Sequence, residues 1–167
     1  MNAVFSTKTF EAQGKRVFEL LKRAYPTEST RRFLTVPALK NGLKRLYTTG
    51  VVVVVVDSED ELFELALRPS LPQSMAVIVI LPGRDESLLR VAGALQPALI
   101  WFDDNSVDDL MAIIGRIKVE QQIKREELED LELSWSEEYP NLTRFLWHSM
   151  KTHGPRIQSL AEIVYYA

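Results

Sequence analysis

Short apolar runs alternate with amphipathic segments along the first two thirds of the chain. The runs span residues 3–6, 32–36, 51–56, 76–81 and 98–102, and the third consists of six consecutive valines. The three middle runs do not alternate with polar residues, which is typical of strands that are covered on both faces. β-branched residues at every position of 51–56 also disfavour a helix. These runs therefore predict short, buried strands.

Helical periodicity fills the intervals between the apolar runs. The predicted helices span residues 10–24, 38–47, 59–67, 86–95 and 106–118. In the first of them one face is apolar, and in the last Ser106 is suited to cap the helix before an acidic first turn. Prolines 26, 69, 72 and 97 fall in the gaps, where they can interrupt regular structure.

Strict alternation of five strands and five helices predicts an α/β fold. We expect a five-stranded, doubly wound parallel sheet in the order 2-1-3-4-5, with helices on both faces and right-handed crossovers. Ligands of such sheets bind at the carboxyl ends of the strands. The strand ends to consider are therefore residues 6–8, 57–58, 82–84 and 103–104.

Composition narrows the class of protein. The chain has 167 residues, enough for one domain plus an extension, and no cysteine. Disulfides, zinc–cysteine sites and thiol catalysis are thereby excluded, and a reducing cytoplasm is the expected location. The N-terminus does not resemble a signal peptide, and no apolar run approaches the roughly 20 residues that span a bilayer. We expect no membrane association.

Charge is unevenly distributed around a net value of −3. Residues 1–50 contain ten Lys and Arg against three Asp and Glu, so the rest of the chain carries −10. A basic excess can indicate nucleic-acid binding. The basic pairs recur at helical intervals among apolar residues, however, as on the solvated face of an amphipathic helix. We therefore predict no nucleic-acid partner.

Three stretches resemble the receiver domain of response regulators. They are VVVVVVD at 51–57, AVIVILPGRDESLLRVAGAL at 76–95 and LIWFDDNSVDDLMAIIGRI at 99–117. In that family the last helix often begins with a Val-Asp-Asp-Leu-like sequence, and SVDDLMAII at 106–114 is similar. The resemblance covers about residues 2–118 and implies the same fold.

The resemblance also implies a phosphoacceptor, which by position is Asp57 at the end of the third strand. The family has two acids at the end of strand 1, a small hydroxyl residue at the end of strand 4 and a lysine at the end of strand 5. At these three places the chain has Ser6-Thr7-Lys8, Leu81-Pro82-Gly83 and Asp103-Asp104. One of five functional positions therefore matches, and the chain resembles a degenerate receiver, or pseudo-receiver.

Phosphoryl transfer needs a divalent cation, and a hard cation needs several oxygen ligands. Lys8 brings positive charge where the family places acids. We therefore expect Asp57 to end its strand without accepting phosphate. An acidic strand-end pocket of Asp57, Asp103 and Asp104, with Lys8 as a counterion, is the alternative use of this edge.

Other catalytic or cofactor chemistry has little support in the sequence. The loop LPGRDES at 81–87 has one glycine and is not a phosphate loop. His148 and His153 are five residues apart and do not share a helical face. No serine lies in a nucleophile-elbow sequence. We therefore predict no enzyme activity, cofactor or metal.

A helical extension is predicted over residues 119–167, after a receiver-like domain at 1–118. Positions 110, 114, 117, 121, 124, 128 and 131 follow coiled-coil spacing, but Gln121 and Lys124 weaken that seam. We predict a homodimer because the extension adds apolar side chains without a core of its own. The predicted association surface comprises Leu110, Ile114, Ile117, Phe145, Leu146 and Met150. The extension could instead pack on its own domain.

The sequence therefore favours a non-catalytic, receiver-like signalling domain that acts through protein–protein interaction. Two alternatives remain open. One is an atypical response regulator that accepts phosphate on an aspartate. The other is an α/β domain that binds a small molecule or nucleotide at the carboxyl edge of its sheet.

Overall fold

The computed structural model describes residues 1–43, 49–67, 71–72 and 74–138. The contacts divide the chain into two compact units, Met1–Lys118 and Val119–Ala167. Among the described residues, no helix combines the length and the apolar character needed to cross a membrane. The assignment of 119–167 to a separate helical extension stays a prediction, because residues 139–167 lie outside the described part.

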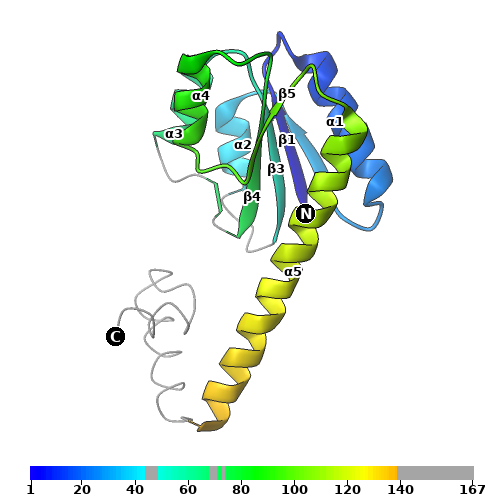
Figure 1. Cartoon of the computed structure of the whole chain (residues 1–167), viewed down its shortest axis with the longest axis vertical. Helices are drawn as coiled ribbons and strands as arrows, with labels where there is room; N and C mark the ends of the chain where they lie inside the picture. Colours follow the sequence, from blue (N-terminus) through cyan, green and yellow to red (C-terminus); the bar gives the residue numbers. More distant parts are fainter. Residues whose placement is uncertain (44–48, 68–70, 73, 139–167) are drawn as a thin grey trace. The chain divides into compact units, whose positions relative to one another are not determined.

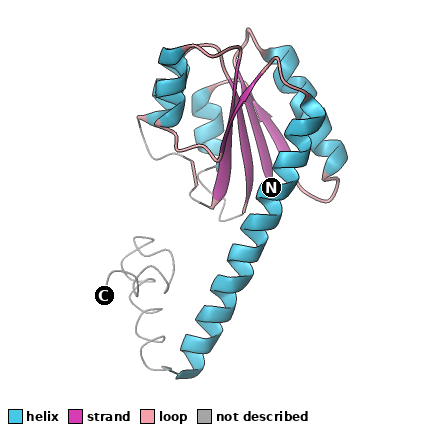
Figure 2. Ribbon diagram, in the orientation of Figure 1, coloured by secondary structure: helices cyan, strands magenta, loops and turns pink. Residues whose placement is uncertain are grey.

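Strands and helices alternate along the described chain, as the periodicity predicts (Figure 2). The strands are β1 (Asn2–Ser6), β2 (Thr30–Phe33), β3 (Gly50–Val55), β4 (Met75–Leu81) and β5 (Leu99–Phe102). The helices are α1 (Glu11–Ala24), α2 (Val36–Leu43), α3 (Glu59–Ala66), α4 (Glu86–Gly93) and α5 (Val107–Glu138).

All the strands pair in parallel, in the order β2-β1-β3-β4-β5, which confirms the predicted topology (Figure 1). β3 is central, with Val53 opposite Val4 of β1 and Ile78 of β4. The valines from Val51 to Val56 are all fully buried. A strand that buries both faces needs backbone partners on both sides, and β1 and β4 provide them.

Two apolar layers cover the sheet. On one face α2, α3 and α4 pack on alternate sheet residues, including Val52, Val54 and Val56. On the other face α1 and α5 pack on Val51, Val53 and Val55. Consecutive side chains of a strand point to opposite faces, so one valine run supplies both layers.

The second strand begins and ends earlier than the sequence predicts. The prediction of 32–36 is wrong at its end, because Val36 begins α2 and is buried there. The Thr35 hydroxyl accepts a hydrogen bond from the Ala38 backbone N–H at 3.3 Å. Thr35 therefore caps the helix, and Pro37 fits in the first turn, where its missing N–H costs nothing.

The structure corrects part of the predicted association surface. Leu110 and Ile114 are 1% and 0% exposed and lie in the core beside the sheet, with Ile117 packed against the same cluster. Leu110 and Ile114 therefore have no surface to offer a partner. Phe145, Leu146 and Met150 lie outside the described residues.

An ion pair fixes residue 118 of α5 to the loop between α1 and β2. The Lys118 Nζ lies 2.5 and 2.6 Å from the two Glu28 carboxylate oxygens, and 3.9 Å from the centroid of the Tyr25 ring. Burial opposes ionisation of Glu28. The hydrogen bonds and positive charges of Lys118 and of the Met1 ammonium, 3.5 Å from Glu28, together outweigh that effect and hold the pKa of Glu28 below its usual value.

Gly14 should be intolerant of a side chain. A Cβ at Gly14 of α1 would overlap the side chain of Ser6 in β1, and both residues are buried. We expect Gly14→Ala to lower the free energy of unfolding by about 2 kcal/mol, measured by urea denaturation, despite the better helix propensity of alanine.

The matched control is Gly93→Ala in α4, where a Cβ would meet no atom within 4 Å. That variant should be neutral or slightly stabilising. Adding Ser6→Gly to Gly14→Ala removes the overlapping side chain, so the double variant should lose less stability than the sum of the single variants. Simple additivity would contradict the close approach of α1 and β1.

Loss of the Lys118 ion pair should depend on pH. Because the pKa of Glu28 is lowered in the folded protein, its contribution is present above the usual glutamate pKa of about 4.3 and is lost as the pH falls through the lowered value. We expect Lys118→Met to cost about 1 kcal/mol at pH 7 and much less at pH 3. Lys22→Met, at an exposed position of α1, is the control. A pH-independent loss would argue against the ion pair.

Candidate functional site

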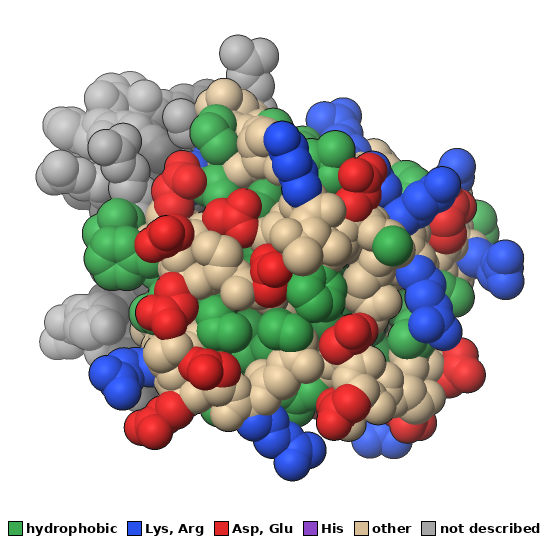
Figure 3. All heavy atoms as spheres, turned by 90° about the horizontal axis from the view of Figure 1, so that it is seen from above, with side chains coloured by type: hydrophobic (Ala, Val, Ile, Leu, Met, Phe, Trp, Pro, Cys, Tyr) green, Lys and Arg blue, Asp and Glu red, His purple; other side chains and the backbone are tan. Residues whose placement is uncertain are grey.

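The carboxyl edge of the sheet brings together the loops that follow β1, β3, β4 and β5. Viewed onto this edge, acidic side chains gather over the face, and Lys and Arg side chains lie mostly toward its periphery (Figure 3). Asp57 follows β3 after the last buried valine and is half-buried. The central position of β3 therefore places this carboxylate near the middle of the edge.

A hydroxyl group from the neighbouring loop holds Asp57. The Thr7 Oγ1 donates a hydrogen bond to Asp57 Oδ1 at 3.0 Å and accepts one from the Phe10 backbone N–H at 3.3 Å. Thr7 is only 3% exposed, and its own N–H donates to the Val55 carbonyl at 3.1 Å. Thr7 thus joins the start of α1 to the carboxylate that ends β3.

The other polar side chains after β1 do not approach Asp57 in the same way. Ser6 is fully buried against Gly14, and its Oγ has no hydrogen-bond partner within the described part of the chain. Lys8 is exposed. Among the hydrogen bonds of the described residues, the one from Thr7 is the only bond that joins segment 6–8 to the Asp57 side chain.

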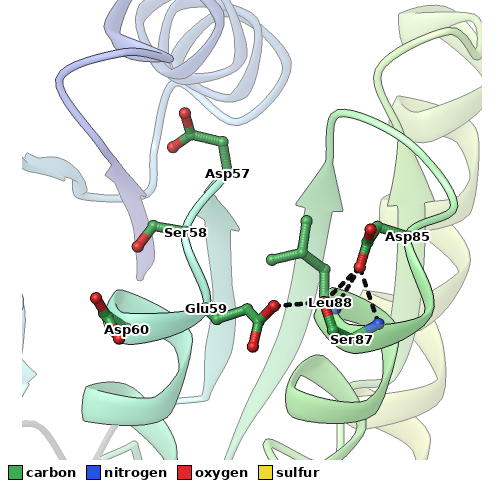
Figure 4. A pocket seen from close by; sticks show the side chains of 7 residues that line it. All are labelled: Asp57, Ser58, Glu59, Asp60, Asp85, Ser87 and Leu88. Carbon is green, nitrogen blue, oxygen red and sulfur yellow. Dashed lines mark hydrogen bonds between the residues drawn. The ribbon is translucent and has the colours of Figure 1, made fainter.

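A pocket of about 420 Å³ opens between the N-terminal ends of α3 and α4 (Figure 4). Its lining combines four carboxylates with two hydroxyls and one apolar side chain: Asp57, Ser58, Glu59, Asp60, Asp85, Ser87 and Leu88. The pocket is therefore acidic, and the first turns of two helices form its walls.

Ser87 links the two walls of the pocket. Its hydroxyl oxygen lies within hydrogen-bond distance of Glu59 of α3 and, at 2.5 Å, of Asp85, so the two carboxylates share one donor hydrogen (Figure 4). Asp85 also caps α4, because its Oδ1 accepts the backbone N–H groups of Ser87 and Leu88 at 2.8 and 3.2 Å. These hydrogen bonds, above all that from the Ser87 hydroxyl, lower the pKa of Asp85.

Glu61 also responds to the acidic surroundings. Partial burial, and then repulsion from Asp57, Glu64 and Asp60, raise the pKa of this carboxyl above its usual value. The acids around the start of α3 thus favour the protonated form of Glu61. A cationic group at this edge would reverse that effect.

The structure groups Asp57 with acids other than those that the sequence suggests. Asp103, Asp104 and Lys8 are exposed and do not line the pocket. The Arg84 guanidinium lies 5.2 Å from the centroid of the Phe102 ring at the end of β5. The loop after β4 therefore covers the ring that precedes Asp103.

Sequence signals existed for the partners of Asp57 that the prediction missed. Glu59 and Asp60 lie two and three residues after Asp57, in the first turn of α3, which begins at the same edge of the sheet. Asp85 precedes a helical pattern, as a capping residue does. Thr7 had no comparable signal, because its role depends on the pairing of β1 with β3.

The residues around Asp57 do not fit the magnesium site that the receiver resemblance implies. On the β1 side its carboxylate meets a donating hydroxyl in place of further carboxylates. On the pocket side, no three acidic or histidine side chains in the described part of the chain are grouped so that they could hold a metal ion. A hard divalent cation needs more oxygen ligands than the side chains around Asp57 bring together.

Comparison with known proteins gives one structural likeness. No protein-family model matches the chain, and no curated protein matches its sequence significantly. A structure of RcsB from Salmonella enterica serovar Typhimurium, bound to promoter rprA in the presence of the phosphomimetic BeF3-, aligns with a TM-score of 0.48 and 17% identity. The alignment covers 83% of this chain and 82% of that chain. The fold is receiver-like by its own strand order and pairing.

Thr7→Val should uncouple Asp57 from the loop after β1. Valine keeps the shape of threonine but leaves Asp57 Oδ1 and the Phe10 N–H without their hydroxyl partner. We expect a loss of about 1–2 kcal/mol in the free energy of unfolding. Thr7→Ser, which keeps the hydroxyl, should lose less than about half of that amount. A loss in Thr7→Ser without a loss in Thr7→Val would assign the effect to packing of the methyl group instead of the hydroxyl.

Proposed function

We propose that the chain is a non-catalytic, receiver-like signalling domain that acts by binding proteins and is not phosphorylated by the magnesium-dependent route. The observation that supports this proposal is the hydrogen bond between Thr7 Oγ1 and Asp57 Oδ1. An aspartate that attacks a phosphoryl group needs a free carboxylate oxygen beside a cation. In this chain the hydroxyl of Thr7, in the loop after β1, donates to one oxygen of Asp57 where carboxylates would be needed to hold a cation. Among the described residues, no three acidic or histidine side chains are grouped so that they could hold one.

The electrostatics of the edge support the same proposal. Asp57, Glu59, Asp60 and Asp85 line one pocket, and no basic side chain of the described residues lines it. A phosphoryl donor carries negative charge, so it is repelled at close range unless a cation intervenes. The edge therefore disfavours a phosphoryl donor and suits contact with a positively charged partner better than phosphate chemistry.

Phosphodonor treatment tests the proposal. The full chain is incubated with acetyl phosphate and magnesium, and its intact mass is measured. We expect no phosphate adduct, because the carboxylates that would bind the cation needed for transfer do not converge at Asp57. A receiver domain with the full set of family residues serves as the positive control.

A stoichiometric phosphate adduct that Asp57→Asn abolishes would overturn the proposal and favour an atypical phosphoacceptor. An adduct that persists in Asp57→Asn would identify modification elsewhere and leave the proposal for Asp57 intact. A double variant, Thr7→Asp with Lys8→Asp, introduces two acids after β1. It tests whether the missing carboxylates are the reason that Asp57 is not phosphorylated.

A further inference from the structure

The outward face of α5 carries two large apolar side chains that the fold leaves uncovered. Val119 and Ile123 are 60% and 48% exposed. Leu110 precedes Val119 by nine residues, and Ile114 precedes Ile123 by nine, which is two and a half turns at about 3.6 residues per turn. By helical spacing, Val119 and Ile123 therefore belong to a different stripe of α5 from Leu110 and Ile114, which pack in the core.

Residues on this outward face follow coiled-coil spacing. Successive members are four, three, four, three and four residues apart, and all six are exposed: Ala112, Arg116, Val119, Ile123, Glu126 and Asp130. This spacing produces a continuous stripe along a helix and is suited to packing against a second helix. The stripe differs from the seam predicted from the sequence, whose first residues face the sheet.

The charges within the stripe distinguish between the possible partners. In a parallel pair of identical helices each residue would meet its own copy, so Arg116 would face Arg116 and Glu126 would face Glu126. Such like-charge contacts are unfavourable. In an antiparallel pair centred on residue 121, Arg116 faces Glu126 of the other copy at both ends. Between these ion pairs, Val119 faces Ile123 of the other copy twice.

We infer that the outward face of α5 is a homodimer surface, on which two copies of the chain pack antiparallel through Val119 and Ile123 and are aligned by reciprocal Arg116–Glu126 ion pairs. The inference deepens the proposed function by naming a second copy as one protein partner. A two-fold axis through the centre makes the contact closed and self-complementary.

The local geometry of Glu126 is compatible with this role. The Gln122 Nε2 donates to Glu126 Oε1 at 2.7 Å, which orients the carboxylate while Oε2 can accept from an arginine. Within one helix Arg116 and Glu126 are ten residues and thus about 15 Å apart. The two side chains cannot pair directly within one copy, so an interaction between them reports on a second copy.

A second exposed apolar pair provides a matched comparison. Phe63 on α3 and Leu67, the residue that follows this helix, have the same spacing and are 55% and 62% exposed. The residues beside them on that helix are acidic, including Asp60 and Glu64, so a second copy would bring acid against acid. The charge pattern selects the α5 face and not the α3 face for self-association.

Sedimentation of the full chain at about 1–200 μM tests the inference. Because the contact consists of two apolar layers and two ion pairs, we expect a reversible dimer that dissociates in the micromolar range and weakens with salt. Val119→Ser with Ile123→Ser should weaken the dimer at least about tenfold. Phe63→Ser with Leu67→Ser should change it less than about twofold. Circular dichroism checks that each variant keeps its helices.

Charge reversal tests the antiparallel register. Arg116→Glu and Glu126→Arg should each weaken the dimer about tenfold, because two attractive pairs become repulsive. The double variant restores both pairs with their charges exchanged and should return to within about threefold of the original dissociation constant. A parallel pair would gain nothing from the double change.

Several results would overturn the inference: a full chain that stays monomeric to 200 μM, a dimer insensitive to the Val119 and Ile123 changes, equal sensitivity to the α3 control, or no recovery in the double charge variant. These results are independent of the phosphodonor assay. Failure of the dimer and failure of the proposed function at Asp57 can therefore be told apart.

Discussion

Burial of the valine run of β3 on both faces is the constraint on which the rest of the structure depends. Val51 to Val56 are all fully buried. Their backbone N–H and C=O groups need partners on both sides, and their side chains need cover above and below. β1 and β4 satisfy the first requirement, and two helical layers satisfy the second.

The same constraint positions the candidate site. Since β3 is central and parallel to β1, the residue that follows the valines lies beside the loop after β1. Asp57 consequently meets Thr7, while the first turns of α3 and α4 enclose its other side. Receiver-like topology thus places a carboxylate at the edge where chemistry could occur. Its neighbours there are the Thr7 hydroxyl and the acidic side chains of the pocket.

α5 carries two apolar stripes. Leu110 and Ile114 complete one apolar layer of the core, and the ion pair of Lys118 with Glu28 fixes residue 118 to the α1–β2 loop. By helical spacing Val119 and Ile123 belong to the second stripe, and both side chains are exposed. The sequence alone does not show which of two apolar stripes on a helix is buried in the core of its domain, because both follow helical spacing.

The sequence by itself determined the order of elements, the parallel sheet and the central place of β3, because apolar runs, β-branching and helical periodicity are local properties. It misplaced the end of β2, since the capping role of Thr35 competed with a strand-like apolar run. Only the tertiary structure decided which side chains surround Asp57 and which face of α5 is covered. Those outcomes depend on strand register and helix packing between residues distant in the chain, such as Thr7 and Asp57, which no local pattern encodes.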